Sequence, residues 1–351
     1  MNSIRIDINQ NPIVYDIKIG NQILKESLLD INGYHKALII HDSAIHSNII
    51  SLIIESLADN NIKADSFPID ISRYPKSIST FISLSEWLPL NGYNKDSLLI
   101  SLGGGSIGDL VGFVASSYYR GIDYIQIPST LLSMIDSSIG GKTGLDTREG
   151  KNLIGSFYHP QKVIIDTCLL SSLDDAEINS GLFEAIKYAI LFDRNLFDFI
   201  DKHLDNIRSL DVINKVIIDC CRIKSTIIEH DEKDLGDRMK LNFGHTIGHA
   251  IESIYGLRHG ESVGYGMRCA IDISKQLGTL SEYSYNEINT LLCQLPLPDL
   301  KVDIDLIINQ LAKDKKVKDG KNNFILLNDI GNSYISNDVS MNIIKNSILN
   351  L

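Results

Sequence analysis

Three histidines and one glutamate have types and spacings that suit a metal site. His245 and His249 lie four residues apart in LNFGHTIGHAIE, so on a helix they share one face. His259 follows in LRHGE, and Glu184 in GLFEAIKY offers a carboxylate. A catalytic zinc site needs three nitrogen, oxygen or sulfur ligands and one open position. The metalloprotease motif would need a glutamate next to the first histidine, and Thr246 stands there. From the residues alone, His245 and His249 are the favoured pair of ligands, although such pairs are also common on helix surfaces and in cores.

A glycine-rich turn could bind a diphosphate. The apolar run at 97–102 predicts a buried strand, which breaks into Gly103–Gly105. Glycine lets the backbone turn sharply and approach a ligand, and a helix containing Leu110 would direct its positive end toward an anion. The pattern differs from G-x-G-x-x-G, so a strand-to-helix turn without a ligand is an equally good interpretation of these residues alone.

A second glycine turn lies close to charged and amide side chains. Residues 138–143 read SIGGKT and include Lys142, and Asp146, Lys151 and Asn152 follow closely. Two cations, an acid and an amide beside glycine turns suit a phosphorylated and hydroxylated ligand. Further candidate cations are Lys187, Lys224, Arg238, Lys315 and Lys316. Taken singly, each could equally well be an ordinary solvated residue on a helix face or in a charge run.

The elements that must position these residues fall into two groups. Short apolar strands alternate with helices in the first half, which predicts a parallel sheet. The strands are expected at 36–41, 62–69, 97–102 and 162–166, with helices at 44–58 and 77–87, after two strands and a turn within 3–19 around Asn11-Pro12. Helical periodicity marks 174–192, 195–206, 211–229, 240–256, 260–277, 284–294 and 303–313, followed by a strand at 323–328 and a helix near 338–349.

This order of elements predicts an α/β protein with two domains. We expect a Rossmann-like parallel-sheet nucleotide domain at residues 1–165 and a mostly α-helical domain at residues 166–351. A site between two such domains is a normal place for catalysis.

The composition describes a globular protein and argues against some partners. The chain has 351 residues, 44% of them hydrophobic, and a net charge of −11, which disfavours nucleic acid as a general partner. The first residues lack a signal-peptide pattern, and no apolar run is long enough to span a membrane. The five cysteines have no regular spacing, which favours reduced thiols. We therefore expect a cytoplasmic protein.

An ordered series of motifs closely resembles the 3-dehydroquinate synthase family, the sugar phosphate cyclases of the shikimate pathway. The matching segments are GGGSIGD at 103–109, YYRG at 118–121, PSTLL at 128–132, DSSIGGKTGLD at 136–146 and GKNLIG at 150–155. The resemblance implies an enzyme that converts 3-deoxy-D-arabino-heptulosonate 7-phosphate to 3-dehydroquinate and phosphate, with NAD and one divalent ion, zinc or cobalt. In the implied reaction NAD oxidises a ring hydroxyl that the metal acidifies, phosphate is eliminated, the hydride returns, and an aldol step closes the carbocycle.

The resemblance also assigns roles to individual residues. It implies Glu184, His245 and His259 as the metal ligands, and it separates them from His249, which falls at a substrate-facing position. Implied substrate contacts are Lys142, Asn152, His249 and Lys315 or Lys316 to the phosphate, Lys224 and Arg238 to the carboxylate with Asn242 as an amide contact, and Asp146 and Lys187 to the hydroxyls. Arg120 matches an arginine that reaches the phosphate from the neighbouring subunit, which implies a homodimer.

The resemblance also assigns residues to NAD binding. The assigned positions are Asp42, Lys76, Gly103, Gly104, Gly105, Ser106, Ile107, Gly108, Asp109, Ser129, Thr130, Lys142, Lys151, Leu169, Leu170, Ser171 and Ser172. Two nearby positions depart from the family. Arg73 stands where a glutamate usually grips the ribose, and Ala44 stands where asparagine is common. Arg73 could favour a 2′-phosphate, but a single loop arginine is more often solvated. Asp42 is also compatible with a cap for the helix at 44–58.

Three other interpretations stay open from the sequence. Another sugar phosphate cyclase would act on a substrate without a carboxylate, and would leave Lys224, Arg238 and Asn242 without a partner in a dry pocket. A metal-dependent NAD polyol dehydrogenase would need fewer phosphate-binding cations and would release NADH. A non-catalytic oligomer would not need matching residues at the metal, phosphate and carboxylate positions.

Overall fold

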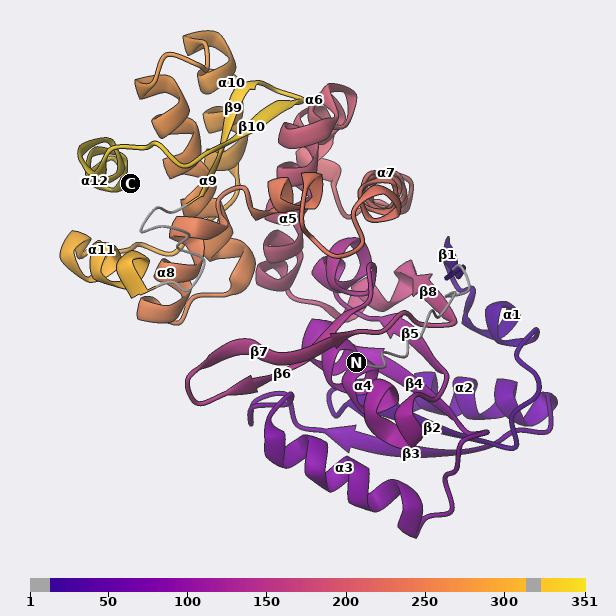
Figure 1. Cartoon of the computed structure of the whole chain (residues 1–351). Helices are drawn as coiled ribbons and strands as arrows, with labels where there is room; N and C mark the ends of the chain where they lie inside the picture. Colours follow the sequence, from indigo (N-terminus) through magenta and orange to yellow (C-terminus); the bar gives the residue numbers. More distant parts are fainter. Residues whose placement is uncertain (1–12, 314–322) are drawn as a thin grey trace, which may run out of the picture.

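Six parallel strands form the sheet of the first half of the chain, in the order β1-β8-β5-β4-β2-β3 (Figure 1). The computed structural model describes residues 13–313 and 323–351. The strands are β1 (Asp16–Gly20), β2 (Lys36–Asp42), β3 (Lys63–Ile69), β4 (Leu98–Gly103), β5 (Tyr124–Pro128) and β8 (Lys162–Asp166). The predicted parallel sheet is confirmed. The first of the two strands expected within 3–19 lies outside the described residues.

Alternate residues of strand β2 enter different hydrophobic clusters. Leu38 and Ile40 of β2 belong to the cluster of α3 (Ile78–Leu90) and α4 (Gly105–Ser117). Their neighbours Ala37 and Ile39 belong to the cluster of α1 (Leu24–Leu28) and α2 (Ser47–Asp59). All four side chains are fully buried, and a buried leucine or isoleucine contributes about 1.5–3 kcal/mol. The cluster that contains Ala37 and Ile39 also includes residues of the helical half, so the two halves share one core.

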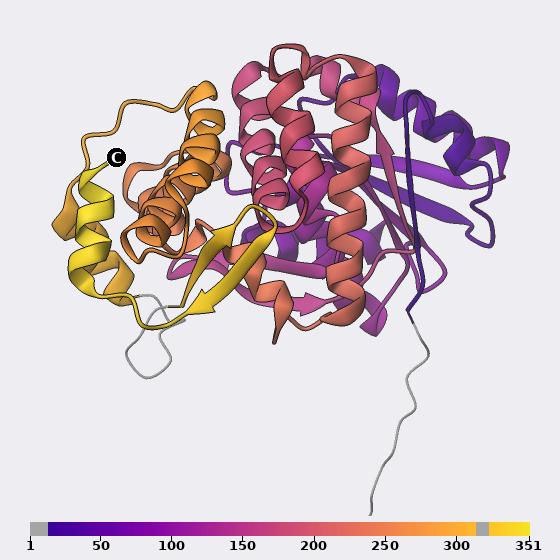
Figure 2. The same cartoon turned by 90° about the horizontal axis from the view of Figure 1, so that it is seen from above.

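The second half is mostly helical, as predicted, and its helices lie beside the sheet domain (Figure 2). They are α5 (Asp175–Phe192), α6 (Arg194–His203), α7 (Leu210–His230), α8 (His245–Tyr255), α9 (His259–Gln276), α10 (Glu282–Gln294), α11 (Ile304–Lys313) and α12 (Met341–Leu349), with a hairpin of β9 (Phe324–Asp329) and β10 (Asn332–Ser336). A domain boundary after residue 165 would fall near the end of β8 and stays a prediction.

Three local predictions need correction. The helix expected at 240–256 is interrupted: a 3₁₀ turn, η5 (Asp237–Asn242), is followed by Gly244 with φ +76°, and α8 begins at His245. The left-handed backbone at Gly244 favours glycine, so the break is encoded there. Helix α6 ends at His203, and a 3₁₀ turn, η4 (Leu204–Asn206), continues the chain to the expected end at 206. Asp42 does not cap α2, whose N-cap is His46; it accepts a hydrogen bond from the Ala44 N–H at 2.9 Å.

A hairpin that the sequence did not predict projects from the sheet half toward the helical half. Strands β6 (Lys142–Thr147) and β7 (Gly150–Phe157) pair antiparallel and extend from the sheet domain toward α8 (Figure 1). The hairpin carries Lys142, Asp146, Lys151 and Asn152, so these four candidate side chains lie on one projecting element.

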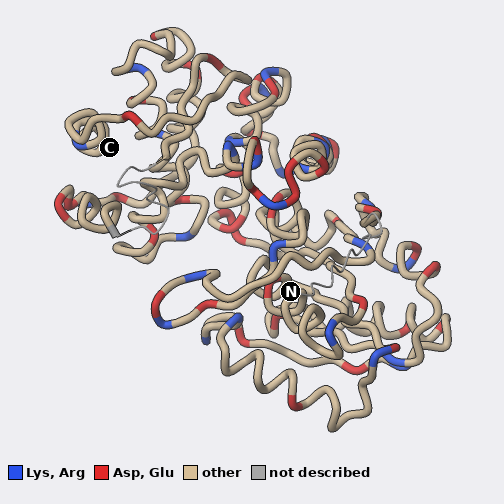
Figure 3. Tube along the Cα trace, in the orientation of Figure 1, with Lys and Arg blue, Asp and Glu red and all other residues tan. Residues whose placement is uncertain are grey.

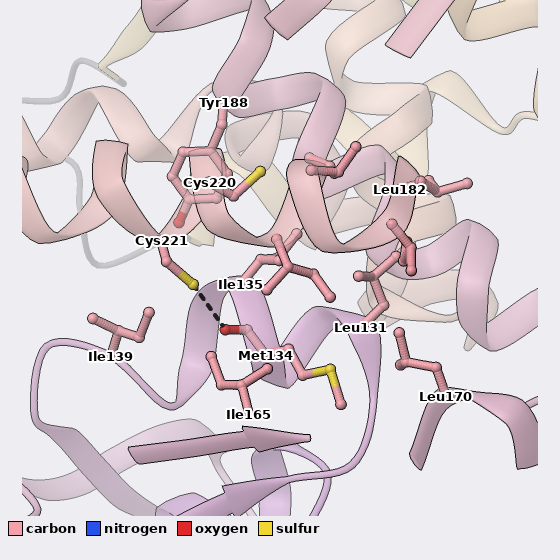
Figure 4. Close-up of a cluster of buried hydrophobic side chains, with 14 of the residues drawn as sticks. Leu131, Met134, Ile135, Ile139, Ile165, Leu170, Leu182, Tyr188, Cys220 and Cys221 are labelled. Atoms are coloured by element: carbon pink, nitrogen blue, oxygen red, sulfur yellow. Dashed lines mark hydrogen bonds between the residues drawn. The ribbon is translucent and has the colours of Figure 1, made fainter. Parts of the chain in front are cut away.

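A buried apolar layer connects the sheet with α5 and α7 (Figure 4). Cys220 and Cys221 of α7 are buried there, and the Cys221 thiol donates to the Met134 carbonyl at 3.5 Å. Met134 belongs to η2 (Ser133–Ser137), a single π-helical turn. The cysteines are free thiols, and packing explains this pair, as expected.

Charged side chains of both signs are interspersed along the described trace (Figure 3). Among the described helices, none combines the length and the apolar character that crossing a bilayer requires.

Candidate active site between the two halves

A close contact between α5 and α9 brings the candidate metal ligands together. A Cβ atom on Gly260 would lie 2.0 Å from the Ser180 carbonyl oxygen, so only glycine allows this approach. The Gly260 N–H also donates to the Ser180 hydroxyl at 3.1 Å. Glu184 lies one helical turn after Ser180, and His259 directly precedes Gly260. The contact therefore places Glu184 beside His259.

The ligand atoms of Glu184, His245 and His259 all lie within 4.8 Å of one another. Glu184 Oε1 is 3.6 Å from His245 Nε2 and 3.4 Å from His259 Nε2. The carboxylate is fully buried and forms an ion pair with Lys187, yet neither oxygen accepts a regular hydrogen bond from the described residues. A buried carboxylate that faces two imidazoles in this way fits a divalent cation.

The protonation states of Glu184 and His245 also suit a cation. Burial alone would raise the pKa of Glu184, but Lys187, His259 and His245 together lower it to about 2. The side chain is therefore ionised at neutral pH. Burial and the nearby Lys187 charge hold the pKa of His245 well below its ordinary value, so its imidazole is neutral and can offer a lone pair.

The pair His245 and His249, which the residues alone favoured, is divided between two groups. His249, Glu252 and His259 form a second set of ligand atoms within 4.8 Å, which shares only His259 with the first. The His249 ring centroid lies 5.0 Å from that of His245 and 5.9 Å from that of His259. His249 is thus adjacent to the candidate metal site and outside the set that contains the buried Glu184.

Three of the candidate cations are buried and do not lie on a solvated helix face. The exposed fractions of Lys187, Lys224 and Arg238 are 1%, 5% and 3%. Arg238 donates to the Gly140 carbonyl at 3.3 Å and to the Glu232 carbonyl at 2.5 Å. Buried cations are costly unless paired, so chemically this cluster can accept anionic groups. The nearby Asn242 side chain donates to the Met239 carbonyl at 3.0 Å.

Asp136 is a site residue that the sequence reasoning missed. It forms an ion pair with Lys224, and its side chain accepts from the Tyr188 hydroxyl at 2.8 Å. Burial alone would raise the pKa of Asp136, but Lys224 and Lys187 lower it, so the carboxylate is ionised. Asp136 stands inside the quoted DSSIGGKT motif, but a single aspartate in a serine-rich turn carries no signal of burial.

The glycine turn after β4 leaves a helix end free of acidic side chains. Gly104 is the N-cap of α4, no side chain caps it, and the first turn contains no acid. A Cβ atom on Gly105 would lie 2.7 Å from the Ser137 hydroxyl oxygen, so the turn is shaped for glycine. The first N–H groups of α4 and the positive helix end therefore suit a diphosphate.

Charged partners surround the hairpin residues. Lys76 lies 2.8 Å from Asp109, 2.6 Å from the Asn152 amide oxygen and 3.6 Å from Asp146. Lys142 pairs with Asp234, and Lys151 Nζ lies 2.5 Å from Glu252.

The remaining candidates are more scattered. Arg73 is 85% exposed and pairs with Asp70, as expected for a solvated loop arginine. Leu169 and Leu170 are buried in η3 (Thr167–Ser172), in which Ser171 and Ser172 are exposed. The first turn of α4 contains Ser106, Ile107 and Gly108. The Ser129 N–H donates to the Gly103 carbonyl, which holds the chain after β5 next to the glycine turn. The Thr130 side chain forms a hydrogen bond with the Ser133 hydroxyl. Arg120 is exposed at the end of η1 (Tyr118–Arg120), and Lys315 and Lys316 lie outside the described residues.

Solved structures identify the class to which this fold belongs. A 2-deoxy-scyllo-inosose synthase complexed with carbaglucose-6-phosphate, NAD+ and Co2+ is 26% identical, with a TM-score of 0.86 over 95% of each chain. A 2-epi-5-epi-valiolone synthase from Streptomyces hygroscopicus subsp. jinggangensis 5008, with NAD+ and Zn2+ bound, is 26% identical, with a TM-score of 0.87 over 99% of this chain and 98% of the other. The architecture is that of the sugar phosphate cyclases.

Sequence comparison narrows the class. Family models described as 3-dehydroquinate synthase N-terminal and C-terminal match residues 68–180 and 181–317. The 3-dehydroquinate synthase of Haemophilus ducreyi (strain 35000HP) is 37% identical over 336 residues, 93% of each chain. The chain belongs to the 3-dehydroquinate synthase family.

Proposed function

We propose that this chain catalyses the reaction of its family: conversion of 3-deoxy-D-arabino-heptulosonate 7-phosphate to 3-dehydroquinate and phosphate. The observation that carries the proposal is the position of Glu184, His245 and His259 next to the buried Lys187, Lys224 and Arg238. A metal site combined with buried cations suits a hydroxylated substrate that bears both a phosphate and a carboxylate. We further propose that the enzyme works in the cytoplasm, in the shikimate route to aromatic amino acids.

Two cofactors fit the residues. NAD would lie with its diphosphate at the N-terminus of α4, within reach of Ser106 and the second glycine turn, and Lys76 and Asp42 would serve the ribose. Glu184, His245 and His259 would hold zinc or cobalt. When bound, NAD accepts and returns a hydride, and the divalent ion polarises the hydroxyl that is oxidised.

Substrate binding would fall to residues from both halves of the chain. Lys224 and Arg238, with Asn242, would hold the carboxylate, and Asp146 and Lys187 the hydroxyls. The phosphate would be oriented by Lys142, Asn152, His249 and Lys315 or Lys316. In the present structure Asp136 and Asp234 neutralise Lys224 and Lys142. An anionic substrate would compete with these carboxylates, and positioning in a water-poor site would supply most of the catalysis.

The assembly is part of the proposal. Arg120 is exposed at the end of η1. An arginine in this position could reach the phosphate in the site of a second copy, so we propose a homodimer with shared sites.

Substrate choice tests this function against that of the other cyclases. Purified protein with Zn²⁺ or Co²⁺ and NAD should release phosphate from the heptulosonate phosphate and form 3-dehydroquinate. Glucose 6-phosphate, which lacks a carboxylate, should be turned over at least about a thousandfold less efficiently by kcat/KM, because it cannot make the contacts proposed for Lys224 and Arg238. Phosphate release and product absorbance measure both reactions. Equal turnover of glucose 6-phosphate would assign the chain to another cyclase activity.

A further inference from the structure

Glu252 of α8 contacts the candidate metal ligand His259 on the side of its ring away from Glu184. Its Oε2 atom lies 3.1 Å from His259 Nδ1, and its Oε1 atom lies 2.5 Å from Lys151 Nζ on β7. The Glu252 side chain is 12% exposed, whereas that of Lys151 is 67% exposed. Because exposed ion pairs are weak, the contact with His259 is the more significant of the two.

The two nitrogens of His259 face different carboxylates. Nε2 lies 3.4 Å from Glu184, and Nδ1 faces Glu252. A neutral imidazole carries one hydrogen, and an ionised carboxylate can only accept it. With that hydrogen on Nδ1, toward Glu252, the Nε2 lone pair is directed at the space between Glu184 and His245.

His245 is held in the same way by a different acceptor. Its Nδ1 lies 3.0 Å from the Phe243 carbonyl oxygen, which also requires a hydrogen on Nδ1. Both imidazoles therefore present Nε2 to the carboxylate of Glu184. Ligand histidines in metal sites are commonly oriented by such acceptors. For His259 the acceptor is a side chain, so it can be changed by mutation.

Glu252 could instead be a ligand, since its oxygen lies within 4.8 Å of ligand atoms of His249 and His259. The burial of Glu184 argues against that arrangement. Both Glu184 oxygens lack a regular hydrogen bond from the described residues, whereas Glu252 is already satisfied by His259 and Lys151. Beyond its ion pair with Lys187, Glu184 can therefore accept a further cation, whereas the polar contacts of Glu252 are already made.

We propose that Glu252 is a positioning residue for the metal site: it holds the Nδ1 hydrogen of His259 so that Nε2 is aligned with Glu184 and His245. This proposal rests on one part of the proposed function, the binding of a divalent ion at Glu184. Glu252 does not touch the ion or the substrate.

Metal affinity of the full-length protein, without substrate, tests the proposal. Glu252→Ala should weaken Zn²⁺ affinity about 10- to 100-fold in competition with a chelator, and should shift the visible spectrum of the Co²⁺-loaded protein. Glu252→Gln keeps an acceptor oxygen and should recover most of the affinity and the spectrum. Glu177→Ala removes an exposed partner of Arg258, beside His259, and should leave both unchanged.

Glu184→Ala distinguishes the ways in which this proposal can fail. Wild-type affinity and spectrum in folded Glu252→Ala, with binding lost in Glu184→Ala, would overturn the role of Glu252 and leave the proposed function intact. Binding lost in Glu252→Ala but kept in Glu184→Ala would make Glu252 a ligand, and would overturn both the positioning role and the proposed metal site. Thermal melts of the apo variants verify that each is folded.

Discussion

Replacing His245 with alanine should remove the metal ion and lower turnover at least about a thousandfold. His245 Nε2 lies 3.6 Å from the buried Glu184 carboxylate, and its loss leaves two protein ligands of the proposed three. A bound ion supplies several kcal/mol of transition-state stabilisation, and each 1.36 kcal/mol corresponds to about tenfold in rate. Metal content by elemental analysis and phosphate release measure the two effects.

His249→Ala is the matched control for this prediction. It removes the neighbouring imidazole of α8, whose ring centroid is 5.0 Å from that of His245, and should leave metal content near one ion per chain. Activity should still fall, because His249 is proposed to orient the phosphate. The ligand assignment is wrong if His245→Ala retains the ion and His249→Ala loses it.

Arg238→Lys should lower kcat/KM about a hundredfold while the protein keeps its metal ion and its NAD affinity. The guanidinium is 3% exposed and donates to the carbonyls of Gly140 and Glu232. Its planar shape can bind these oxygens and a substrate carboxylate at once, and a lysine ammonium does not reproduce that geometry. Losing a hydrogen bond to a charged group costs about 1.5–3 kcal/mol, which corresponds to the expected change.

Arg222→Lys provides the comparison for Arg238. Arg222 is 77% exposed on α7 and pairs with Asp219, so its replacement should leave kcat/KM unchanged. Steady-state kinetics of both variants, with elemental analysis and NAD titration, separate a lost substrate contact from a general disturbance of the site. Normal turnover by Arg238→Lys would count strongly against a carboxylate contact there.

The helices of the second half could be predicted because their apolar residues recur at intervals of three and four. Segments 174–192, 211–229 and 260–277 agree with α5, α7 and α9 to within a residue or so at each end. The same periodicity runs across Gly244, so it could not show that the backbone turns left-handed there. Strand β7 was missed because most of its side chains are exposed, so it lacks the alternation of a half-buried strand.

The candidate site could be predicted only in part. Histidine spacing within α8 suggested His245 with His249, because local sequence shows which residues share a helix but not which helix faces another. The contact of Gly260 with Ser180 brings Glu184 to His259 from a distant part of the chain. Asp136 and Glu252 were missed for a similar reason: their roles depend on partners far away in sequence, Lys224 and His259.

The fate of the hydride tests the central claim, that the dinucleotide is a catalyst in a phosphate-eliminating cyclisation. Purified metal-loaded protein is given the heptulosonate phosphate in large excess over NAD, and phosphate release and absorbance of reduced nicotinamide are followed together. A substrate held by buried cations keeps the oxidised carbon beside the nicotinamide, so return of the hydride should be faster than escape. The account predicts phosphate well in excess of the NAD supplied, with no lasting reduced cofactor. Reduced cofactor that accumulates in step with product would contradict it and would show a dehydrogenase.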